Sequence, residues 1–208
     1  TLCDNLFNNQ GAKARNWLTT RGIDENAMIR FNLGFTTGGF VQSLEFSGGR
    51  GIVIPHYNKY TRTIAALKVR RPVSEGTTNK YYCVKGSKPS SSLYNADSLS
   101  DQKICFVTEG EFDTIALHSQ ISDLAAVITL GSKTAKLANY WLPHLLGIRH
   151  YYIATDANED EQAANYWLDL VGNRGKRVLP PGGCKDVCDA VIAGYDLRAW
   201  AMAIIEQG

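Results

Sequence analysis

Carboxylate side chains follow three apolar segments in the second half of the sequence. Glu109 comes directly after one segment, in TEGEFDTIAL, and Asp156 comes directly after RHYYIAT. Asp186 and Asp189 follow a third segment and a turn that contains two prolines and two glycines. Carboxylate oxygens are the ligands that Mg²⁺ and Mn²⁺ prefer, and substrate phosphates often complete such sites. The sequence therefore predicts a divalent-metal site if the three segments end at one edge, although each acidic group alone could instead cap a helix.

The segments around these acidic residues alternate between strand and helix patterns. We expect strands over residues 103–108, 125–130, 149–155 and 176–179, and helices over residues 111–120, 133–146 and 159–172. Such alternation predicts a mostly parallel sheet with helices on both faces, whose strand ends form the edge where ligands collect. Neither G-x-G-x-x-G nor G-x-x-x-x-G-K-[ST] occurs, which argues against dinucleotide-binding and P-loop proteins.

Positive charge is concentrated in the first half of the sequence. Residues 1–100 contain 13 lysines and arginines and 6 acidic residues, whereas residues 101–208 contain 9 and 14. Tyr81 lies between Lys80 and Lys85 in the most basic part. Because cations bind phosphates while aromatic rings stack on bases, this composition predicts a track for single-stranded nucleic acid. A basic surface that only confers solubility is the alternative.

Two strands are expected in this basic part. Residues 51–55 read as a strand that a proline ends, and residues 63–71 read as the next strand after a polar turn. Side chains alternate along a strand, so Lys68 and Arg70 share one face of the second strand. That face would present two neighbouring cations.

The sequence also indicates how the chain is organised. Asp24 is expected to cap a short helix that ends at Gly34. Residues 86–100 are rich in serine and polar residues and read as a linker. We therefore expect a basic nucleic-acid-binding lobe over residues 1–100 and a catalytic lobe over residues 101–208.

Composition narrows the class of protein further. The sequence has no run of about 18 uncharged apolar residues and no signal-peptide pattern, so we expect a cytoplasmic protein without a membrane partner. The five cysteines form no disulfide framework. Cys184 and Cys188 are close in sequence, but no second pair completes a zinc site, so we expect structural thiols.

The segments TEGEFDTIAL, IATDANEDEQAA and GGCKDVCDAVI resemble the three signatures of the Toprim fold, which bacterial-type primases, topoisomerases and certain nucleases share. The first half resembles the catalytic core of bacterial-type and phage primases in WLTTRGIDENAMIRFNLGF, GIVIPHYN, AALKVRR and KYYCVKGSKPSSSLYN. The resemblance spans roughly residues 14–192. It implies an α/β protein with an N-terminal mixed α+β basic lobe, followed by a Rossmann-like Toprim lobe with a mostly parallel sheet.

The resemblance also implies roles for particular residues. The implied catalytic residues are Glu109, Asp156 and Asp186. The implied metal-binding set is Glu109, Asp113, Asp156, Asn158, Asp160, Asp186 and Asp189. The residues implied to bind nucleic acid or nucleotide are Lys68, Arg70, Arg71, Lys80, Tyr81 and Lys85. Asn158 departs from the family, because it replaces the second aspartate of a D-x-D pair, and a neutral amide binds Mg²⁺ more weakly than a carboxylate does.

The implied function is that of a DNA primase core, a nucleotidyltransferase that makes short RNA primers on single-stranded DNA. Its cofactor would be Mg²⁺ or Mn²⁺, its substrates ribonucleoside triphosphates, and a replicative helicase its expected partner. We expect it to act in a nucleoid or phage replication complex, as the core of a longer primase or primase-helicase. Two alternatives stay open: a Toprim nuclease or strand breaker, and a catalytically weak module that binds single-stranded DNA and recruits a helicase.

Overall fold

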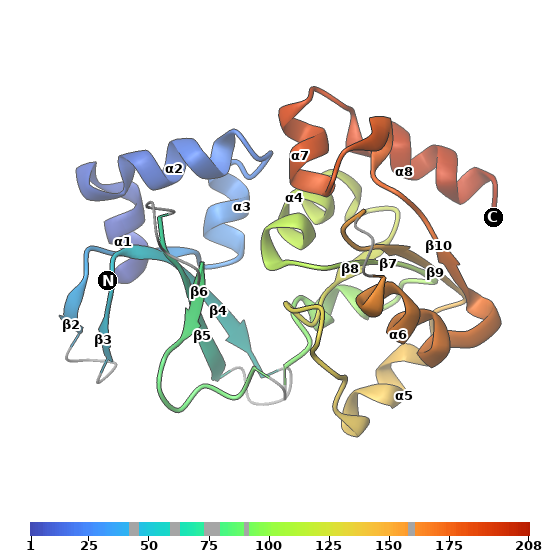
Figure 1. Ribbon diagram of the computed structural model, residues 1–208, viewed down its shortest axis with the longest axis horizontal. Coiled ribbons are helices and arrows are strands. Elements are labelled where there is room, and N and C mark those ends of the chain that lie inside the picture. Colours follow the sequence, from blue (N-terminus) through green and yellow to red (C-terminus); the bar gives the residue numbers. More distant parts are fainter. Residues whose placement is uncertain (42–45, 59–62, 73–79, 90–91, 158–160) are drawn as a thin grey trace. The chain divides into compact units, whose positions relative to one another are not determined.

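The computed structural model describes residues 1–41, 46–58, 63–72, 80–89, 92–157 and 161–208 (Figure 1). The chain divides into two compact units. The first comprises Thr1–Thr19 and Asp24–Ser92, and the second comprises Thr20–Ile23 and Leu93–Gly208. The first unit contains an antiparallel sheet and the second a parallel sheet, each with helices, which confirms the predicted α/β fold class. The functional assignment of residues 1–100 and 101–208 stays a prediction.

Helices precede the sheet in the first unit. They are α1 (Leu2–Phe7), a short 3₁₀ helix (Asn9–Gly11), α2 (Ala12–Thr19) and α3 (Glu25–Arg30). The strands are β1 (Gly34–Thr36), β2 (Gly39–Val41), β3 (Phe46–Gly48), β4 (Gly51–Tyr57), β5 (Ile64–Arg70) and β6 (Tyr81–Cys83). Four of them form an antiparallel sheet in the order β1-β4-β5-β6, while β2 and β3 pair with each other.

The C-terminus of α3 differs from the expectation. Asp24 caps the helix as predicted, because its side chain accepts a hydrogen bond from the Ala27 backbone N–H. The helix ends at Arg30, however, and Asn32 (φ 50°) takes the left-handed conformation that was expected of a glycine. The backbone N–H of Leu33 donates to the carbonyl of Met28, the bond of a Schellman motif. Gly34 instead begins β1.

The prediction that a proline ends the first basic strand was wrong. β4 continues through Pro55 to Tyr57 and pairs with β5 beyond this point. Its other neighbour, β1, pairs only with residues 51–53. Pro55 therefore has a paired strand on one side, which is the edge position where a missing backbone N–H is tolerated.

The second unit is built on a parallel sheet in the order β10-β9-β7-β8. Its strands are β7 (Ile104–Thr108), β8 (Ala126–Ile128), β9 (His150–Ala154) and β10 (Gly175–Arg177). Its α-helices are α4 (Glu111–Ile121), α5 (Leu142–Leu145), α6 (Gln162–Val171), α7 (Val187–Ile192) and α8 (Leu197–Glu206). Short 3₁₀ helices cover Ala96–Leu99, Asn139–Trp141, Gly172–Arg174 and Pro181–Gly183.

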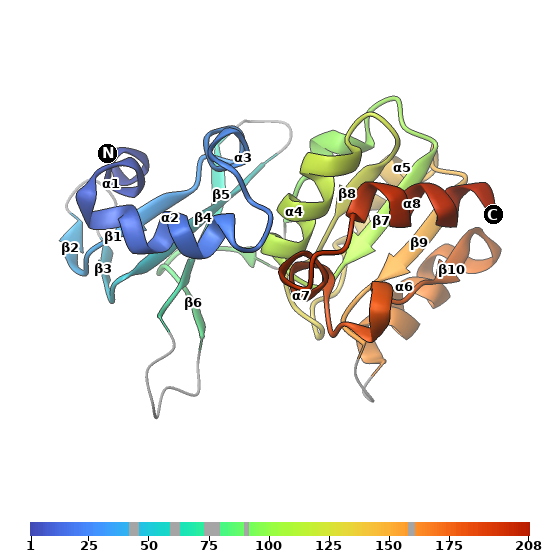
Figure 2. The same cartoon turned by 90° about the horizontal axis from the view of Figure 1, so that it is seen from above.

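Helices cover both faces of this sheet, as predicted (Figure 2). On one face Tyr151 and Ile153 belong to a buried cluster that includes Trp167 of α6. On the other face the ring of Phe106 lies 5.7 Å from that of Trp200 in α8. Alternate residues of the strands thus pack against different helices, because successive side chains point to opposite faces.

The predicted helix over residues 133–146 is mostly absent from the part of the chain that the structure describes. A 3₁₀ turn over Asn139–Trp141 leads into the four-residue helix α5, with Pro143 in its first turn. Proline has no backbone N–H to donate, so it fits the first turn of a helix but breaks a helix that reaches it from upstream, and α5 accordingly begins at Leu142. Upstream, the backbone N–H of Leu137 donates to the Tyr166 hydroxyl instead of to a helical carbonyl.

The segment expected to be a linker contributes to the core of the second unit. Leu93, Ala96 and Leu99 are buried in the cluster beneath the sheet. The Asn95 amide donates to the carbonyl of Val127 in β8 at 2.8 Å. Residues 93–100 are therefore part of the second unit, because their apolar side chains are buried in its core.

The structure also bears on the state of the cysteines and on membrane-spanning helices. All five cysteines are free thiols, as expected. Within the described ranges, no helix combines the length and apolar character that crossing a bilayer requires.

Candidate functional site

Glu109 and Asp156 follow neighbouring parallel strands. β7 and β9 are paired so that Thr108 lies opposite Ala154, and Glu109 and Asp156 come just after these residues. The Glu109 carboxylate accepts a hydrogen bond from the backbone N–H of Asp156. The Thr129 hydroxyl, from the end of β8, donates to the Glu109 carbonyl at 2.8 Å. Three strand ends thus fix the position of Glu109.

The environment of Glu109 favours its protonated form. Partial burial is the main cause that raises its pKa, and the charge of Asp156 raises it further. Asp156 has a raised pKa as well, mainly through burial, although Lys185 opposes the shift. Both carboxyl groups therefore keep a proton up to a higher pH than exposed acids do.

Asp113, in the first turn of α4, shows the largest shift among these acids. Burial and the charge of Asp186 raise its pKa from 3.8 to about 7. The backbone N–H of Cys188 donates to its Oδ1 at 3.1 Å, and the Cys188 thiol is a second donor. These bonds connect α4 with α7 and hold Asp113 beside Asp186.

Lys185 lies between two of the acidic side chains. Its Nζ is 3.0 Å from Oδ2 of Asp156 and 3.6 Å from Oδ2 of Asp186. The Lys185 carbonyl accepts a hydrogen bond from the backbone N–H of Ala157 at 2.7 Å, which anchors this turn to the end of β9. Asp186 also caps α7, because its Oδ1 accepts from the backbone N–H of Asp189 at 2.7 Å. Asp186 therefore serves both as a helix cap and as a member of the acidic group.

The structure brings five predicted residues into one electrostatically coupled group, which we call the carboxylate cluster: Glu109, Asp113, Asp156, Asp186 and Asp189. Asn158 and Asp160, which were also expected to bind metal, lie outside the described residues. Among the residues that are described, no three His, Cys, Asp or Glu side chains are already arranged as a set of metal ligands. The carboxylate cluster therefore contains oxygen ligands suited to a metal ion, but they are not arranged in advance around one position.

Two residues of this region were missed in the sequence. Arg177 of β10 donates to the carbonyls of Ile153, Thr155 and Asp156 at 2.8, 3.1 and 3.0 Å, and so holds the end of β9 in place. A lone arginine in a short strand gives no sequence signal for this role. Lys185 had a signal, because it is a cation directly before an aspartate in the acidic turn.

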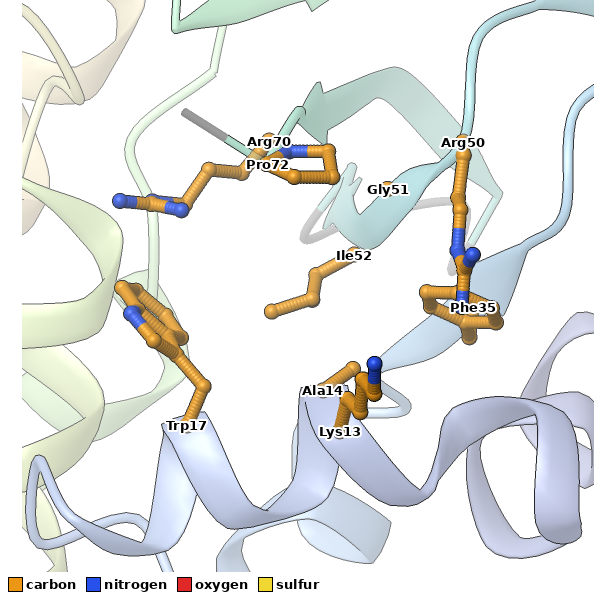
Figure 3. A pocket seen from close by; sticks show the side chains of 9 residues that line it. All are labelled: Lys13, Ala14, Trp17, Phe35, Arg50, Gly51, Ile52, Arg70 and Pro72. Atoms are coloured by element: carbon orange, nitrogen blue, oxygen red, sulfur yellow. The ribbon is translucent and has the colours of Figure 1, made fainter. Parts of the chain in front are cut away.

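In the first unit the predicted basic residues occupy two faces of β5. Lys68 lies 4.6 Å from the ring centroid of Tyr81. On the same face the Arg70 guanidinium stacks 3.9 Å from the ring centroid of Trp17 (Figure 3). Arg71 instead lies over Tyr82, which packs against the buried Val69 on the opposite face. The structure therefore groups Lys68, Arg70 and Tyr81 and separates Arg71 from them.

Lys80 and Lys85 flank β6, and both side chains are exposed. The backbone carbonyl of Lys80 accepts a hydrogen bond from the N–H of Arg71, which continues the pairing of β5 with β6. Their surface positions suit contacts with a polyanion but give no fixed geometry for one.

Comparison with known proteins identifies the fold. No protein-family model and no curated protein sequence matches the chain. Solved structures of primase cores do match. The chain is 18% identical to the zinc-binding and RNA polymerase domains of Aquifex aeolicus primase, with a TM-score of 0.73. The match covers 99% of this chain and 59% of the Aquifex chain. It thus spans less than two thirds of the Aquifex chain.

Two further structures extend this likeness. The RNA polymerase domain of Mycobacterium tuberculosis primase DnaG, solved with double-stranded DNA, is 17% identical with a TM-score of 0.76, over 99% of this chain and 76% of that chain. The primase fragment of the bacteriophage T7 primase-helicase is 18% identical with a TM-score of 0.68, over 91% and 71%. The chain has the fold of the catalytic cores of bacterial and phage primases.

Proposed function

We propose that this chain is a primase core that joins ribonucleotides into primers on a single-stranded DNA template. One observation carries the proposal: a chain with the primase-core fold couples five carboxylates at the carboxyl edge of its parallel sheet. Nucleotidyl transfer requires that negative charge on phosphates be neutralised and that a hydroxyl lose its proton. The chain has residues suited to bind phosphate charge and residues suited to accept the hydroxyl proton.

The donor chemistry of the carboxylate cluster fits Mg²⁺ or Mn²⁺. After burial, the charges of neighbouring aspartates contribute to the raised pKa values of Glu109, Asp113 and Asp156, a repulsion that a bound cation would relieve. The Lys185 ammonium between Asp156 and Asp186 supports this fit, because a positive group is already accommodated there. In the proposal Glu109, Asp156 and Asp186 would hold the metal, and the further candidates are Asp113, Asp189, Asn158 and Asp160. A bound divalent ion would supply charge neutralisation at the triphosphate.

The remaining steps fall to side chains of the protein. Glu109, with its raised pKa, is suited to accept a proton from the primer 3′ hydroxyl. Lys68 and Arg70 are suited to bind phosphates, and Tyr81 offers a ring on which a base can stack. Lys80 and Lys85 would add attraction for the backbone of the template. A replicative helicase is the partner expected for such a core.

Primer synthesis by a Glu109→Gln variant tests the proposal. Gln keeps the size of the side chain but cannot take up the proton, so we expect incorporation of labelled ribonucleotides on single-stranded DNA to fall at least about a hundredfold. Folding and DNA binding should stay near wild type. Glu206→Gln, at an exposed position of α8, is the matched control. Normal synthesis by Glu109→Gln would reject the assignment.

A catalytically weak DNA-binding module is the second candidate. The contact of Lys185 with Asp156 favours it, because an internal cation competes with metal for that carboxylate. Incubation with single-stranded DNA and Mg²⁺ or Mn²⁺, with or without ribonucleotides, separates the candidates. Extension supports a primase, cleavage without nucleotides supports a nuclease, and binding without either reaction supports the module.

A further inference from the structure

A turn over residues 181–184, which contains the last of the 3₁₀ segments, leads directly into Lys185 and Asp186. A backbone hydrogen bond of 3.2 Å joins the last residue of the turn to the carbonyl of the first. The two central residues, Gly182 and Gly183, have φ angles of 65° and 73°, as in a type I′ turn. Glycine adopts this conformation readily, but it does not prefer it over others. The route of the chain into the carboxylate cluster therefore needs a contact that fixes this turn.

The ring of Tyr195 lies on one of the two glycines. A Cβ atom at Gly182 would overlap the Tyr195 hydroxyl oxygen and the ring carbon that bears it. A Cβ atom at Gly183 would meet no atom of the described residues within 4 Å. Tyr195 is 44% exposed, so this contact lies at the surface and not in the core. The ring thus covers Gly182 and leaves Gly183 open.

The C-terminus of α7 directs Tyr195 back toward the turn. The backbone N–H of Gly194, whose φ is 85°, donates to the Val191 carbonyl at 2.9 Å. The N–H of Tyr195 donates to the Ala190 carbonyl at 3.0 Å, which completes a Schellman motif. The other end of the same short helix is capped by Asp186. The residue that contacts the turn and the residue that follows the turn are therefore joined through one rigid helix.

Two hydrogen bonds connect the position of the turn with the carboxylate cluster. The Lys185 carbonyl accepts from the N–H of Ala157 at 2.7 Å, and Oδ1 of Asp186 accepts from the N–H of Asp189 at 2.7 Å. Both acceptors belong to residues that directly follow the glycine turn. A shift of the turn would therefore move the Lys185 ammonium and the Asp186 carboxylate together, and would change their distances from Asp156.

We propose that Tyr195 is a positioning residue for the carboxylate cluster. Its ring fixes the glycine turn, and the turn fixes where Lys185 and Asp186 lie. The inference rests on the proposed function in one respect, since it assumes that the cluster binds a divalent metal. Tyr195 acts through the turn and not by contact with metal or substrate.

Amide hydrogen exchange in EDTA, followed by NMR, tests the contact without metal. The N–H of Ala157 reports the position of the turn, because it donates to the Lys185 carbonyl. The N–H of Val107, within β7, reports the stability of the second unit. We expect Tyr195→Ala to speed exchange at Ala157 at least about tenfold and to leave Val107 within about twofold of wild type. Tyr195→Phe keeps the ring over Gly182 and should stay near wild type at both amides.

The two glycines supply a matched pair of variants. Gly182→Ala and Gly183→Ala both place a Cβ atom on a left-handed residue, so both carry a similar backbone strain. Only the Cβ atom at residue 182 displaces the Tyr195 ring. We therefore expect Gly182→Ala to speed exchange at Ala157 at least about threefold more than Gly183→Ala does. In a Tyr195→Ala background this difference should largely vanish, because the two residues act through one contact.

Mn²⁺ binding relates the contact to the proposed metal site. Electron paramagnetic resonance should show that Tyr195→Ala raises the Mn²⁺ dissociation constant about three- to tenfold, because its ligands are present but less well oriented. Tyr195→Phe should bind Mn²⁺ as wild type does. A higher Mn²⁺ concentration should restore primer synthesis to Tyr195→Ala but not to Glu109→Gln, which lacks the carboxylate itself.

Four results would overturn the proposal. These are unchanged exchange at Ala157 in Tyr195→Ala, equal acceleration at Ala157 and Val107, equal effects of the two glycine variants, and Mn²⁺ affinity that Tyr195→Ala leaves at the wild-type value. A wild-type chain that binds no Mn²⁺ would count against the proposed function instead. Exchange in EDTA then still decides whether Tyr195 fixes the turn, so the two failures can be told apart.

Discussion

The ammonium group of Lys185 lies 3.0 Å from Oδ2 of Asp156, a carboxylate whose side chain is 14% exposed. This contact is the main cause that raises the Lys185 pKa. The amine therefore stays charged at neutral pH and occupies one side of a residue proposed to bind metal. Any cation that binds Asp156 through the same oxygen has to displace it.

Replacement of Lys185 by methionine tests this competition. Lys185→Met should raise the affinity for Mn²⁺ about two- to tenfold, a modest change because the lysine is more than half exposed and solvent screens its charge. Free Mn²⁺ measured by electron paramagnetic resonance gives the affinity directly. Lys176→Met, an exposed lysine of β10, is the control. Weaker Mn²⁺ binding by Lys185→Met would mean that the lysine positions Asp156 for the metal instead of competing with it.

Asp113 predicts how stability depends on pH. Its pKa in the folded chain is about 7, against an ordinary value of 3.8. Between these pH values the folded chain holds a proton that the unfolded chain has lost, so the free energy of unfolding decreases as pH rises from about 4 to 7. Asp113→Asn should abolish this decrease. Its free energy of unfolding relative to wild type should therefore rise between pH 4 and pH 7, by at most roughly 4 kcal/mol.

Urea denaturation at pH 5 and pH 8 in EDTA measures the Asp113 effect. Asp169→Asn, at an exposed position of α6, is the control and should show the wild-type pH dependence. If the difference between Asp113→Asn and wild type is the same at both pH values, Asp113 does not titrate in this window.

Arg177 should matter more for stability than its neighbour. Arg177→Gln removes charged donors from the carbonyls at the end of β9, and we expect the free energy of unfolding to fall by about 2 to 3 kcal/mol. Lys176→Gln, at an exposed position of the same strand, should change it by less than about 0.5 kcal/mol. Thermal and urea denaturation check both values. Equal effects of the two substitutions would show that the arginine contacts contribute little.

The two faces of β5 should differ in DNA binding. If the template lies on the face of Lys68 and Arg70, Lys68→Ala should weaken binding to single-stranded DNA and reduce the slope of its salt dependence by about 1. Arg71→Ala should leave that slope unchanged, because Arg71 lies over Tyr82 on the opposite face. Fluorescence anisotropy at several salt concentrations measures the slopes, with Lys103→Ala as the control. A larger effect of Arg71→Ala would place the template on the other face.

The order of strands and helices around Glu109 and Asp156 could be predicted because strand and helix patterns are local. In the buried strand β7, residues 104–107 are all apolar. The acidic residues that follow it mark the first turn of α4. Errors arose where a neighbour decides the outcome. Pro55 lies inside β4 because the pairing of β1 with β4 ends before it. Most of the segment 133–146 is not helical, and its residues instead contact Tyr166 and the core of the second unit.

The sequence by itself determined which acids follow which strands and which half of the chain carries the positive charge, because both depend on residue order alone. The tertiary structure decided that Lys185 lies against Asp156, that Arg177 holds the end of β9, and that Trp17 and Phe35 line one pocket with two arginines (Figure 3). Each of these contacts joins residues on different elements. Their distances depend on how strands pair and helices pack, which residue spacing does not encode.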